Sequence, residues 1–457
     1  MNYFIMKGFT RKRVGFLPGG IFALLLAACT GAGKSGDQAT SEKEELPNIV
    51  YIISDDQAWT DYGFTGHPYI QTPHLDRLAE EGRTYTRGYS VAPLCSPSLA
   101  TLITGVYPQQ HGITGNDPVF EFAGKRYSKE WMLERRNRLQ PWLDRFQQHP
   151  TVPQLLADKG YLSFQSGKWW GGHWKDGGFT GGMTHGDPAR GGRHGDEGLK
   201  IGREGLKPVF DFIDDATTQD KPFFLWYAPF LPHAPHTPPD SLLQKYIDKA
   251  PSEAVARYWA MCEWFDQTIG ELLQQLENKG LSENTLVIYA CDNGWIQNPE
   301  KRNVYMSGSK QDPNEMGIRT PLIFRWPNRI TPGLDTTTLV STVDLVPTML
   351  DATSTPALPE MPGLSVLDEN VLKARDTIFA IDFDHDMVSP DDPGASLQHR
   401  MVLTHPWKLI DPEPANEPGQ PELYNVFEDP FETNNLAGEH PEIVAKLKAS
   451  LDAWWKP

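Results

Sequence analysis

The sequence predicts an α/β fold in which a large sheet is covered by helices on both faces, with a smaller C-terminal antiparallel sheet. Two observations lead to this prediction. Short apolar runs rich in β-branched and aromatic residues alternate with helical patterns along most of the chain. Closely spaced strand patterns follow near the C-terminus. A chain of 457 residues, of which 39% are hydrophobic, is long and apolar enough to bury such a core.

The first strand and helix of the predicted sheet are clearly marked. Residues 48–54 form a continuous apolar run, which is typical of a strand buried on both faces. Residues 72–82 predict a helix, because Pro73 suits a first turn and Gly82 suits a helix end. Further strands are expected at 223–227, 285–290 and 321–326, and further helices at 253–279 and 343–350.

The C-terminal region has a different pattern. Strand-like runs at 377–381, 400–404 and 407–410 are close together, and residues 443–455 predict a terminal helix. Before them, residues 355–363 contain Pro and Gly and are typical of a linker or surface crossing. We therefore expect a main domain at 47–370 and a C-terminal antiparallel subdomain at 371–457.

The N-terminus is typical of an export signal. Basic residues between positions 7 and 13 precede an apolar run at 21–28 that is too short to span a bilayer. The run ends in Leu-Ala-Ala-Cys29, which resembles the lipobox of bacterial lipoproteins. We expect a signal peptide at 1–28, a flexible polar tether at 29–46 and an exported bacterial lipoprotein, periplasmic or at the outer-membrane or cell surface. The lipid anchor would be its only membrane attachment. The alternative is a plain secretory signal in which Cys29 is incidental.

Charge and cysteine content restrict the remaining possibilities. A net charge of −17 argues against a nucleic-acid partner or an anionic membrane surface, since both require a basic face. An anionic substrate is still compatible with this charge if a bound metal makes the site locally positive. Of the 4 cysteines, only Cys262 and Cys291 are left to pair if Cys29 is an anchor and Cys95 is catalytic. We expect both to be buried as small apolar residues.

Cys95 is the most informative single residue. It opens the stretch Cys-Ser-Pro-Ser-Leu, in which Pro97 is typical of a first helical turn. A nucleophile at a helix start is favoured by unpaired backbone N–H groups and by the positive end of the helix dipole. The alternative is a small buried cysteine that precedes an ordinary helix.

Acidic side chains follow two of the predicted strands. Asp55 and Asp56 follow the first strand, and Asp292 and Asn293 follow the strand at 285–290. Ligands of open α/β sheets gather beyond the carboxyl ends of strands. Oxygen donors of this kind suit Ca²⁺ or Mg²⁺ better than zinc. Turns or helix caps are the alternative interpretation of each pair alone.

Together, the motifs point to one family. In chain order they are VYIISDDQ, TPHLDRLAEEG, CSPSLATLITGVYPQQHGI, SGKWW, APFLPHAPHTP, ACDNG, KQDPNEMGIRTPLIFRWP and ELYNVFEDPFETNNLA. Their order and content resemble the formylglycine-dependent sulfatases over roughly residues 47 to 437. The resemblance implies an alkaline-phosphatase-like fold, with a large mixed sheet between helices, and hydrolysis of sulfate esters.

The same resemblance implies roles for individual residues. Cys95 would be converted to formylglycine by a maturation enzyme and would then act as the nucleophile. Lys168 matches the lysine that bonds the formylglycine, and Lys310 the lysine on the sulfate. His233 matches the histidine that protonates the leaving oxygen. The Ca²⁺ ligands would be Asp55, Asp56, Asp292 and Asn293.

Two positions depart from the family pattern. Leu99 stands where the family has arginine in C-x-P-S-R, and Trp170 stands where it usually has histidine after Gly-Lys-Trp. Two polar partners of the formylglycine are therefore apolar in this chain. Replacement donors could come from His173 or from the basic cluster at 190–194.

A Gly-rich segment with aromatic and basic residues follows Lys168 and suits a substrate-binding rim. An ordinary surface loop is the alternative. Asp384-His385-Asp386 is a second candidate to reach the site, with a solvated turn as its alternative. We expect a sulfated polysaccharide or oligosaccharide as substrate, contacted by His173, Arg193, His194 and His236.

Two other functions are compatible with these motifs. A phosphodiesterase or phosphonate hydrolase of the same superfamily would also combine a nucleophile with a metal, but its zinc-using members usually carry more His and Asp ligands. A non-catalytic sugar-binding relative would explain Leu99 and Trp170 as signs of decay. The retained acids, both lysines and His233 argue against it.

Overall fold

A computed structural model describes residues 45–190, 192 and 194–457. The expected export signal, Cys29, the tether up to residue 44 and Arg193 lie outside the described residues. The remaining expectations can be compared with the structure.

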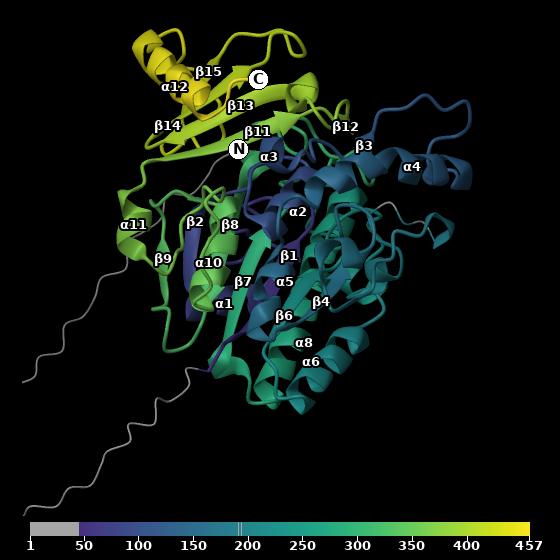
Figure 1. The fold of residues 1–457 in the computed structure, drawn as a ribbon. Coiled ribbons are helices and arrows are strands. Elements are labelled where there is room, and N and C mark those ends of the chain that lie inside the picture. The colour runs from purple at the N-terminus through teal and green to yellow at the C-terminus, as the bar shows by residue number, and fades with distance from the viewer. Residues whose placement is uncertain (1–44, 191, 193) are drawn as a thin grey trace, which may run out of the picture. The chain divides into compact units, whose positions relative to one another are not determined.

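A mixed sheet of nine strands forms the centre of the described part of the chain (Figure 1). In its middle, β1 (Asn48–Ser54) lies between two parallel neighbours, β6 (Phe223–Ala228) and β7 (Thr285–Cys291). The strand order is β10-β2-β8-β7-β1-β6-β4-β5, with β9 paired to β2, and β8 runs antiparallel to both β7 and β2. The other strands are β2 (Arg83–Tyr89), β4 (Leu162–Gly167), β5 (Gly181–Gly182), β8 (Arg319–Arg325), β9 (Gly333–Asp335) and β10 (Val340–Ser341).

Both faces of this sheet are buried under helices. In β1, Tyr51 packs into the apolar cluster on one face, whereas Val50 and Ile52 pack into the cluster on the other. This alternation follows from the two-residue period of a strand. The first face is covered by α2 (Cys95–Thr104), α4 (Lys129–Phe146), α5 (Val152–Leu156) and α10 (Leu345–Ala352). The second is covered by α1 (Pro73–Glu81), α6 (Lys207–Thr218) and α8 (Glu253–Asn278).

A second, antiparallel sheet follows in the C-terminal region. Its strands, in spatial order, are β11 (Thr377–Phe383), β13 (Leu397–Thr404), β14 (Trp407–Pro412) and β15 (Glu422–Asn425). Helix α12 (Pro441–Trp454) covers one face, as Figure 1 shows, and the other face packs against Tyr89, Ile318 and Leu339 beside the large sheet. The predicted fold class, a large covered sheet with a small C-terminal antiparallel sheet, is confirmed.

Short elements complete the described chain. The strand β12 (Asp386–Met387) pairs with β3 (Asp117–Pro118), which brings the C-terminal region beside the segment after α2. The other short helices are α3 (Pro108–His111), α7 (Asp240–Leu243), α9 (Glu315–Ile318) and α11 (Glu369–Ala374). The 3₁₀ turns are η1 (Ala157–Lys159), η2 (Trp174–Gly177), η3 (Pro188–Arg190), η4 (Glu197–Lys200), η5 (Ser282–Asn284), η6 (Thr342–Asp344) and η7 (Pro393–Ser396).

One predicted helix begins later than expected. Residues 342–344 form the 3₁₀ turn η6, and α10 begins at Leu345 rather than at Val343. In a helix that began at Val343, the N–H of residue 347 would have to donate to the carbonyl oxygen of Val343. Proline has no N–H, so this hydrogen bond could not form. Starting at Leu345 places Pro347 in the first turn, where helical N–H groups have no intrahelical partner.

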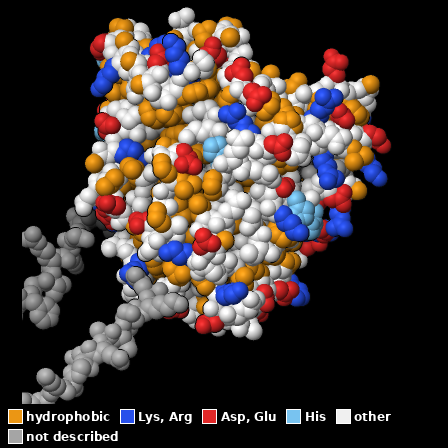
Figure 2. All heavy atoms as spheres, viewed as in Figure 1, with side chains coloured by type: hydrophobic (Ala, Val, Ile, Leu, Met, Phe, Trp, Pro, Cys, Tyr) orange, Lys and Arg blue, Asp and Glu red, His pale blue; other side chains and the backbone are white. Residues whose placement is uncertain are grey.

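The surface and the cysteines of the described residues are also defined. None of the described helices is long and apolar enough to cross a membrane. On the face seen in Figure 2, acidic and basic side chains are interspersed among small apolar areas. Cys262 and Cys291 are buried and unpaired, which confirms the expectation that they act as small apolar residues.

A core substitution tests the central position of β7. Leu286 is fully buried in the cluster on the first face. We expect Leu286→Ala to lower the free energy of unfolding by about 2–5 kcal/mol, because it removes buried methyl groups and leaves a cavity. Urea denaturation would measure the change. The matched control is Leu334→Ala in β9, where the side chain is 61% exposed and the expected change is within about 0.5 kcal/mol. Equal losses in the two variants would contradict this assignment of the core.

Candidate active site

The acidic residues predicted from two separate sequence motifs meet at one edge of the large sheet. The parallel register pairs Ser54 with Cys291, so the residues that follow β1 and β7 are neighbours. The backbone N–H of Asp56 donates to Oδ1 of Asp292 over 3.1 Å, and Nδ2 of Asn293 donates to Oδ1 of Asp56 over 2.7 Å. With Asp55, which is also buried, these side chains form one cluster.

Each member of the acidic cluster keeps one oxygen that accepts no hydrogen bond from the described residues. These buried atoms are Oδ2 of Asp55, Asp56 and Asp292 and Oδ1 of Asn293. A buried oxygen without a donor is costly, so this set is better satisfied with a cation bound. Carboxylate and amide oxygens are the donors that Ca²⁺ and Mg²⁺ prefer. The residues present therefore fit a hard divalent cation.

Two buried lysines offset the charge of the cluster. Nζ of Lys168 donates to Oδ1 of Asp55 over 2.6 Å and lies 3.5 Å from Oδ2 of Asp292. Nζ of Lys310 donates to Oδ1 of Asp56 over 2.5 Å. Burial by itself would raise the pKa of Asp56, but the Lys310 ammonium and neighbouring cationic groups hold that pKa below its usual range. Asp56 thus stays charged although it is buried, whereas burial raises the pKa of Asp55 well above its usual range despite the nearby Lys168 ammonium.

Cys95 lies beside this cluster as the first residue of α2, after Leu94 in extended conformation. Its Sγ is 3.0 Å from Nζ of Lys310 and 4.0 Å from Oδ1 of Asp56. Burial raises the pKa of the Cys95 thiol to about 12, so the thiol is protonated at neutral pH. Because the thiolate is the nucleophilic form of cysteine, the unmodified side chain is a poor nucleophile here.

His233 completes the group around Cys95. Its Nε2 lies 3.4 Å from Oδ2 of Asp56, while its Nδ1 donates to the carbonyl oxygen of Ala234 over 2.5 Å. The ring stacks on Phe230, with 4.0 Å between ring centroids. Burial lowers the pKa of His233, although Asp56 opposes this effect. Within the described residues, Asp55, Asp56, Cys95 and His233 each bring one potential ligand atom within 4.8 Å of the others.

The candidate substrate residues occupy different environments. His236 is buried between Tyr258 and Trp295, and neither ring nitrogen has a hydrogen-bond partner among the described residues. His194 is buried too, and its carbonyl oxygen accepts from the N–H of Trp169, next to Lys168. These two histidines therefore lie inside the protein rather than on an exposed rim.

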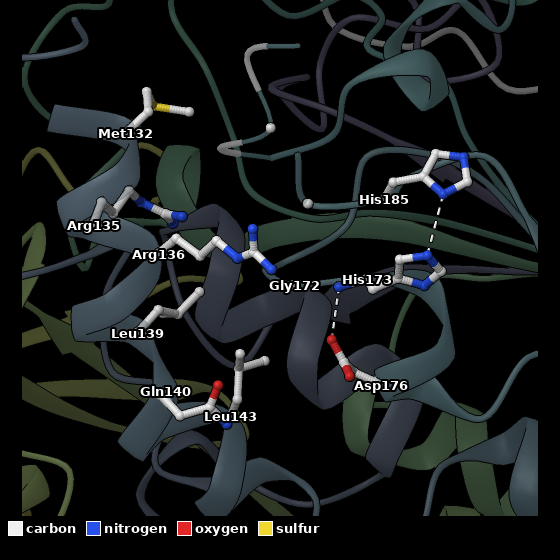
Figure 3. A pocket seen from close by; sticks show the side chains of 12 residues that line it. Met132, Arg135, Arg136, Leu139, Gln140, Leu143, Gly172, His173, Asp176 and His185 are labelled. Atoms are coloured by element: carbon white, nitrogen blue, oxygen red, sulfur yellow. Dashed lines mark hydrogen bonds between the residues drawn. The ribbon is translucent and has the colours of Figure 1, made fainter. Parts of the chain in front are cut away.

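His173 is placed differently. It is half-buried, and its Nε2 lies 3.2 Å from Nδ1 of His185. His173 and His185 both line a pocket whose opposite wall is α4 (Figure 3). Of the candidate substrate residues in the described chain, His173 is the one that lines this pocket.

The two departures from the family pattern belong to one apolar cluster. Leu99, one helical turn after Cys95, and Trp170 are fully buried in the cluster on the first face of the sheet. The Trp170 ring packs against Phe146 with 4.6 Å between centroids, and its carbonyl oxygen accepts from Oγ of Ser96 over 3.3 Å. The first turn of α2, which begins at Cys95, therefore packs on apolar side chains.

The structure also adds a polar residue that the motifs did not single out. Oδ1 of Asn116 accepts from the N–H of Ser96 over 3.0 Å, and its Nδ2 lies 3.5 Å from Nε2 of His385. Nδ1 of His385 in turn contacts Asp386. His385 lies in a sequence segment flagged as a candidate, and the pairing of β3 with β12 brings it here. Asn116 has no sequence signal of its own, because only the tertiary fold places it at the start of α2.

A buried charge network supports the loop that carries Lys310. Nζ of Lys408, on β14, lies 2.8 Å from Oε1 of Glu432 and 3.6 Å from Oε1 of Glu315. Oε2 of Glu432 accepts from Nδ2 of Asn314 and from the N–H of Glu315. Lys408 of the second sheet and Glu432 thus hold Asn314 and Glu315, four and five residues after Lys310.

Comparisons with known proteins agree with this geometry. The family model described as Sulfatase matches residues 47–355, and that described as N-sulphoglucosamine sulphohydrolase, C-terminal, matches residues 309–456. N-acetylgalactosamine-6-sulfatase from Canis lupus familiaris is 30% identical over 407 residues, which cover 78% of this chain and 73% of that protein.

Solved structures share the fold at lower identity. The crystal structure of Ps i-CgsB, also solved in complex with k-i-k-neocarrahexaose, has a TM-score of 0.69 and 21% identity, with 90% of this chain and 93% of that chain covered. Phosphonate monoester hydrolase of Agrobacterium radiobacter has a TM-score of 0.65 and 18% identity, with 89% and 96% covered. These likenesses concern the fold alone. The match of the Sulfatase model to most of the chain shows that this protein belongs to the sulfatase family, and it is a sulfuric ester hydrolase.

The buried network under the Lys310 loop can be tested by removing its central charge. We expect Lys408→Met to lower the free energy of unfolding by about 3–5 kcal/mol, because the buried Glu432 carboxylate would lose its ammonium partner. Glu315 would keep its ion pairs with Arg87 and Arg319. The matched control is Lys373→Met, which breaks an exposed pair with Glu369 and should cost within about 0.5 kcal/mol. Urea denaturation compares the two. A Lys408→Met protein as stable as the control would contradict a structural role for the network.

Proposed function

We propose that this sulfatase hydrolyses sulfate esters of carbohydrates with a formylglycine derived from Cys95 and a bound Ca²⁺. The observation that carries the proposal is the arrangement around Cys95. Four buried oxygens that accept no hydrogen bond from the described residues lie just after β1 and β7, and Lys310 is 3.0 Å from Sγ of Cys95. This arrangement supports a nucleophile at position 95 that acts beside a bound cation and a positively charged side chain.

The proposed metal ligands are the four residues of the acidic cluster. Ca²⁺ would supply positive charge that offsets repulsion between a nucleophile and the oxygens of the sulfate group. Zinc is a poor fit, because within the described residues His233 is the only imidazole that lies with these acids. We assign Asp55, Asp56, Asp292 and Asn293 as ligands.

The protein side chains would position the ester and manage its charge. An aldehyde at position 95 supplies, as its hydrate, a hydroxyl group that attacks the sulfur. Lys310 would bind a sulfate oxygen, since its ammonium already contacts Sγ of Cys95. Lys168 would hold the hydroxyl groups at position 95. His233, when protonated at Nε2, would donate its proton to the leaving oxygen.

The substrate class and the cellular location follow from other features. A carbohydrate substrate is supported by the relative whose name describes a sulfatase of N-acetylgalactosamine. The N-terminal motif supports an exported lipoprotein held by a lipid anchor through Cys29. We also propose the division at residue 370, since the second sheet begins at Thr377.

Conversion of Cys95 is the central test. We expect mass analysis of the peptide that contains Cys95, after co-expression with a formylglycine-generating enzyme, to show the aldehyde, and Cys95→Ala to abolish turnover of sulfate esters. The matched control is Cys262→Ala, a buried cysteine in α8 that is not among the residues grouped around Cys95, which should retain turnover. An unmodified Cys95 thiol in a fully active enzyme would refute the mechanism.

Metal binding can be tested without activity. After chelation, Ca²⁺ at 100 times its Kd should stabilise the protein by about 2.7 kcal/mol, seen as a rise in Tm. Asp292→Asn should weaken this response, because it removes a ligand charge, and should leave the metal-free protein no less stable, because it also relieves repulsion among buried carboxylates.

The control for the metal test is Asp211→Asn on α6, an exposed carboxylate paired with Lys207. It should respond to Ca²⁺ as the wild type does. A wild-type Tm that no divalent cation raises, or an equal response of Asp292→Asn, would contradict the assigned ligands.

A further inference from the structure

A pocket of about 240 Å³ lies between α4 and the segment that follows Lys168 (Figure 3). Leu139 and Leu143 of α4 form an apolar wall, and Arg136 extends its guanidinium from the same helix. His173 and Asp176 lie on the other side. The pocket therefore combines apolar, cationic and hydrogen-bonding groups.

Arg136 has no charged partner in the part of the chain that the structure describes. Its neighbour Arg135 pairs with Asp117 over 2.6 Å, and Arg138 pairs with Glu134 over 2.7 Å. Arg136 makes no hydrogen bond or ion pair with any residue that the structure describes. A guanidinium has a planar set of N–H donors that matches carboxylate and sulfate oxygens. Its position in the pocket suits an anionic ligand.

The opposite wall is held in place by its own hydrogen bonds. Nδ1 of His173 accepts from the N–H of Lys175 over 3.0 Å, so the proton of a neutral ring is on Nε2, which faces His185. The Asp176 carboxylate accepts from the N–H of His173 over 2.7 Å and retains acceptor capacity for a hydroxyl group. A ligand with hydroxyl groups and an apolar ring face, as well as an anion, matches this lining.

The pocket is close to Cys95 along both of its walls. Gly172 lines it and follows Trp170 by two residues, so their Cα atoms are at most about 8 Å apart. The Trp170 carbonyl contacts Ser96, the residue after Cys95. On the other wall, Arg135 donates to the carbonyl oxygen of Asn116, whose side chain accepts from the Ser96 N–H. Both walls of the pocket are thus tied to the start of α2, where Cys95 lies.

We propose that this pocket is a subsite for an acidic sugar residue of the substrate, with Arg136 binding its carboxylate or its additional sulfate group. The proposal rests on the proposed function, because the ester that is cleaved lies at Cys95. It makes the enzyme selective for carbohydrates that carry a second anionic group beside the scissile ester.

Kinetics of matched substrates test the subsite. Four probes are compared. The first is a sulfated disaccharide with a free hexuronate carboxylate, and the second is its methyl ester, in which the carboxylate charge is removed and the sulfate is kept. The third is a disulfated disaccharide without carboxylate, and the fourth is an aryl sulfate. Arg136→Ala should lower kcat/KM about 10- to 100-fold for the probe whose second anion is recognised, as expected for a charged hydrogen bond. Turnover of the aryl sulfate and of the methyl ester should stay within about twofold. Which of the two charged probes is affected identifies the group as carboxylate or sulfate.

The control is Arg138→Ala. Arg138 is two residues after Arg136 on the same helix, does not line the pocket and pairs on the surface with Glu134, so all four rates should stay unchanged. Equal losses on the aryl sulfate, or no difference between the two variants, would overturn the subsite.

Failure of the proposed function is distinguishable from failure of the subsite. A wild-type protein that cleaves no sulfate ester would refute the function at Cys95. Calorimetry can then still measure the affinity of the pocket for an unsulfated hexuronate disaccharide and for a disulfated disaccharide, since binding needs no turnover. The subsite is supported if one of these probes binds the Arg138→Ala variant but not the Arg136→Ala variant. It is refuted if the two variants bind both probes with equal affinity.

Discussion

The active-site region depends on one electrostatic constraint, the burial of three carboxylates at the ends of two adjacent parallel strands. Asp55, Asp56 and Asp292 are almost completely excluded from solvent and close enough to repel one another. Lys168 and Lys310 offset part of this charge through short contacts from distant parts of the chain. The remaining unsatisfied oxygens suit a divalent cation. The segments that carry these lysines are therefore fixed by the same charges that define the site.

The second sheet belongs to this arrangement although it lies outside the central sheet. Its strand β14 carries Lys408, whose buried ion pairs with Glu315 and Glu432 hold the segment next to Lys310. The short strand β12, which follows β11 in the chain, pairs with β3 and brings His385 beside Asn116. The C-terminal region thus contributes to both sides of the position of Cys95.

The apolar replacements near Cys95 are integrated into the packing. Leu99 and Trp170 share a cluster with Phe146, so the first turn of α2 rests on apolar side chains. Polar contacts to this turn come from Asn116 through the Ser96 N–H and from the Trp170 carbonyl through Ser96 Oγ. The hydrogen bonds around the helix start are therefore made by groups other than the side chains at positions 99 and 170.

The sequence by itself determined the fold class, the helix start at Cys95 and the acidic ends of β1 and β7. These features are local, because strand period, turn residues and helix-start residues act within a few positions. The contact between Asp56 and Asp292, which are 236 positions apart, was indicated only by the rule that the carboxyl ends of parallel strands share an edge. The start of α10 differed by two residues because Pro347 fits only a first turn. Only the tertiary structure buried His194 and His236 and placed Asn116 at the start of α2. It also put Arg136 in a pocket, with no hydrogen bond or ion pair to the described residues. Burial and partner choice depend on contacts between segments far apart in the chain, which residue patterns along the sequence do not encode.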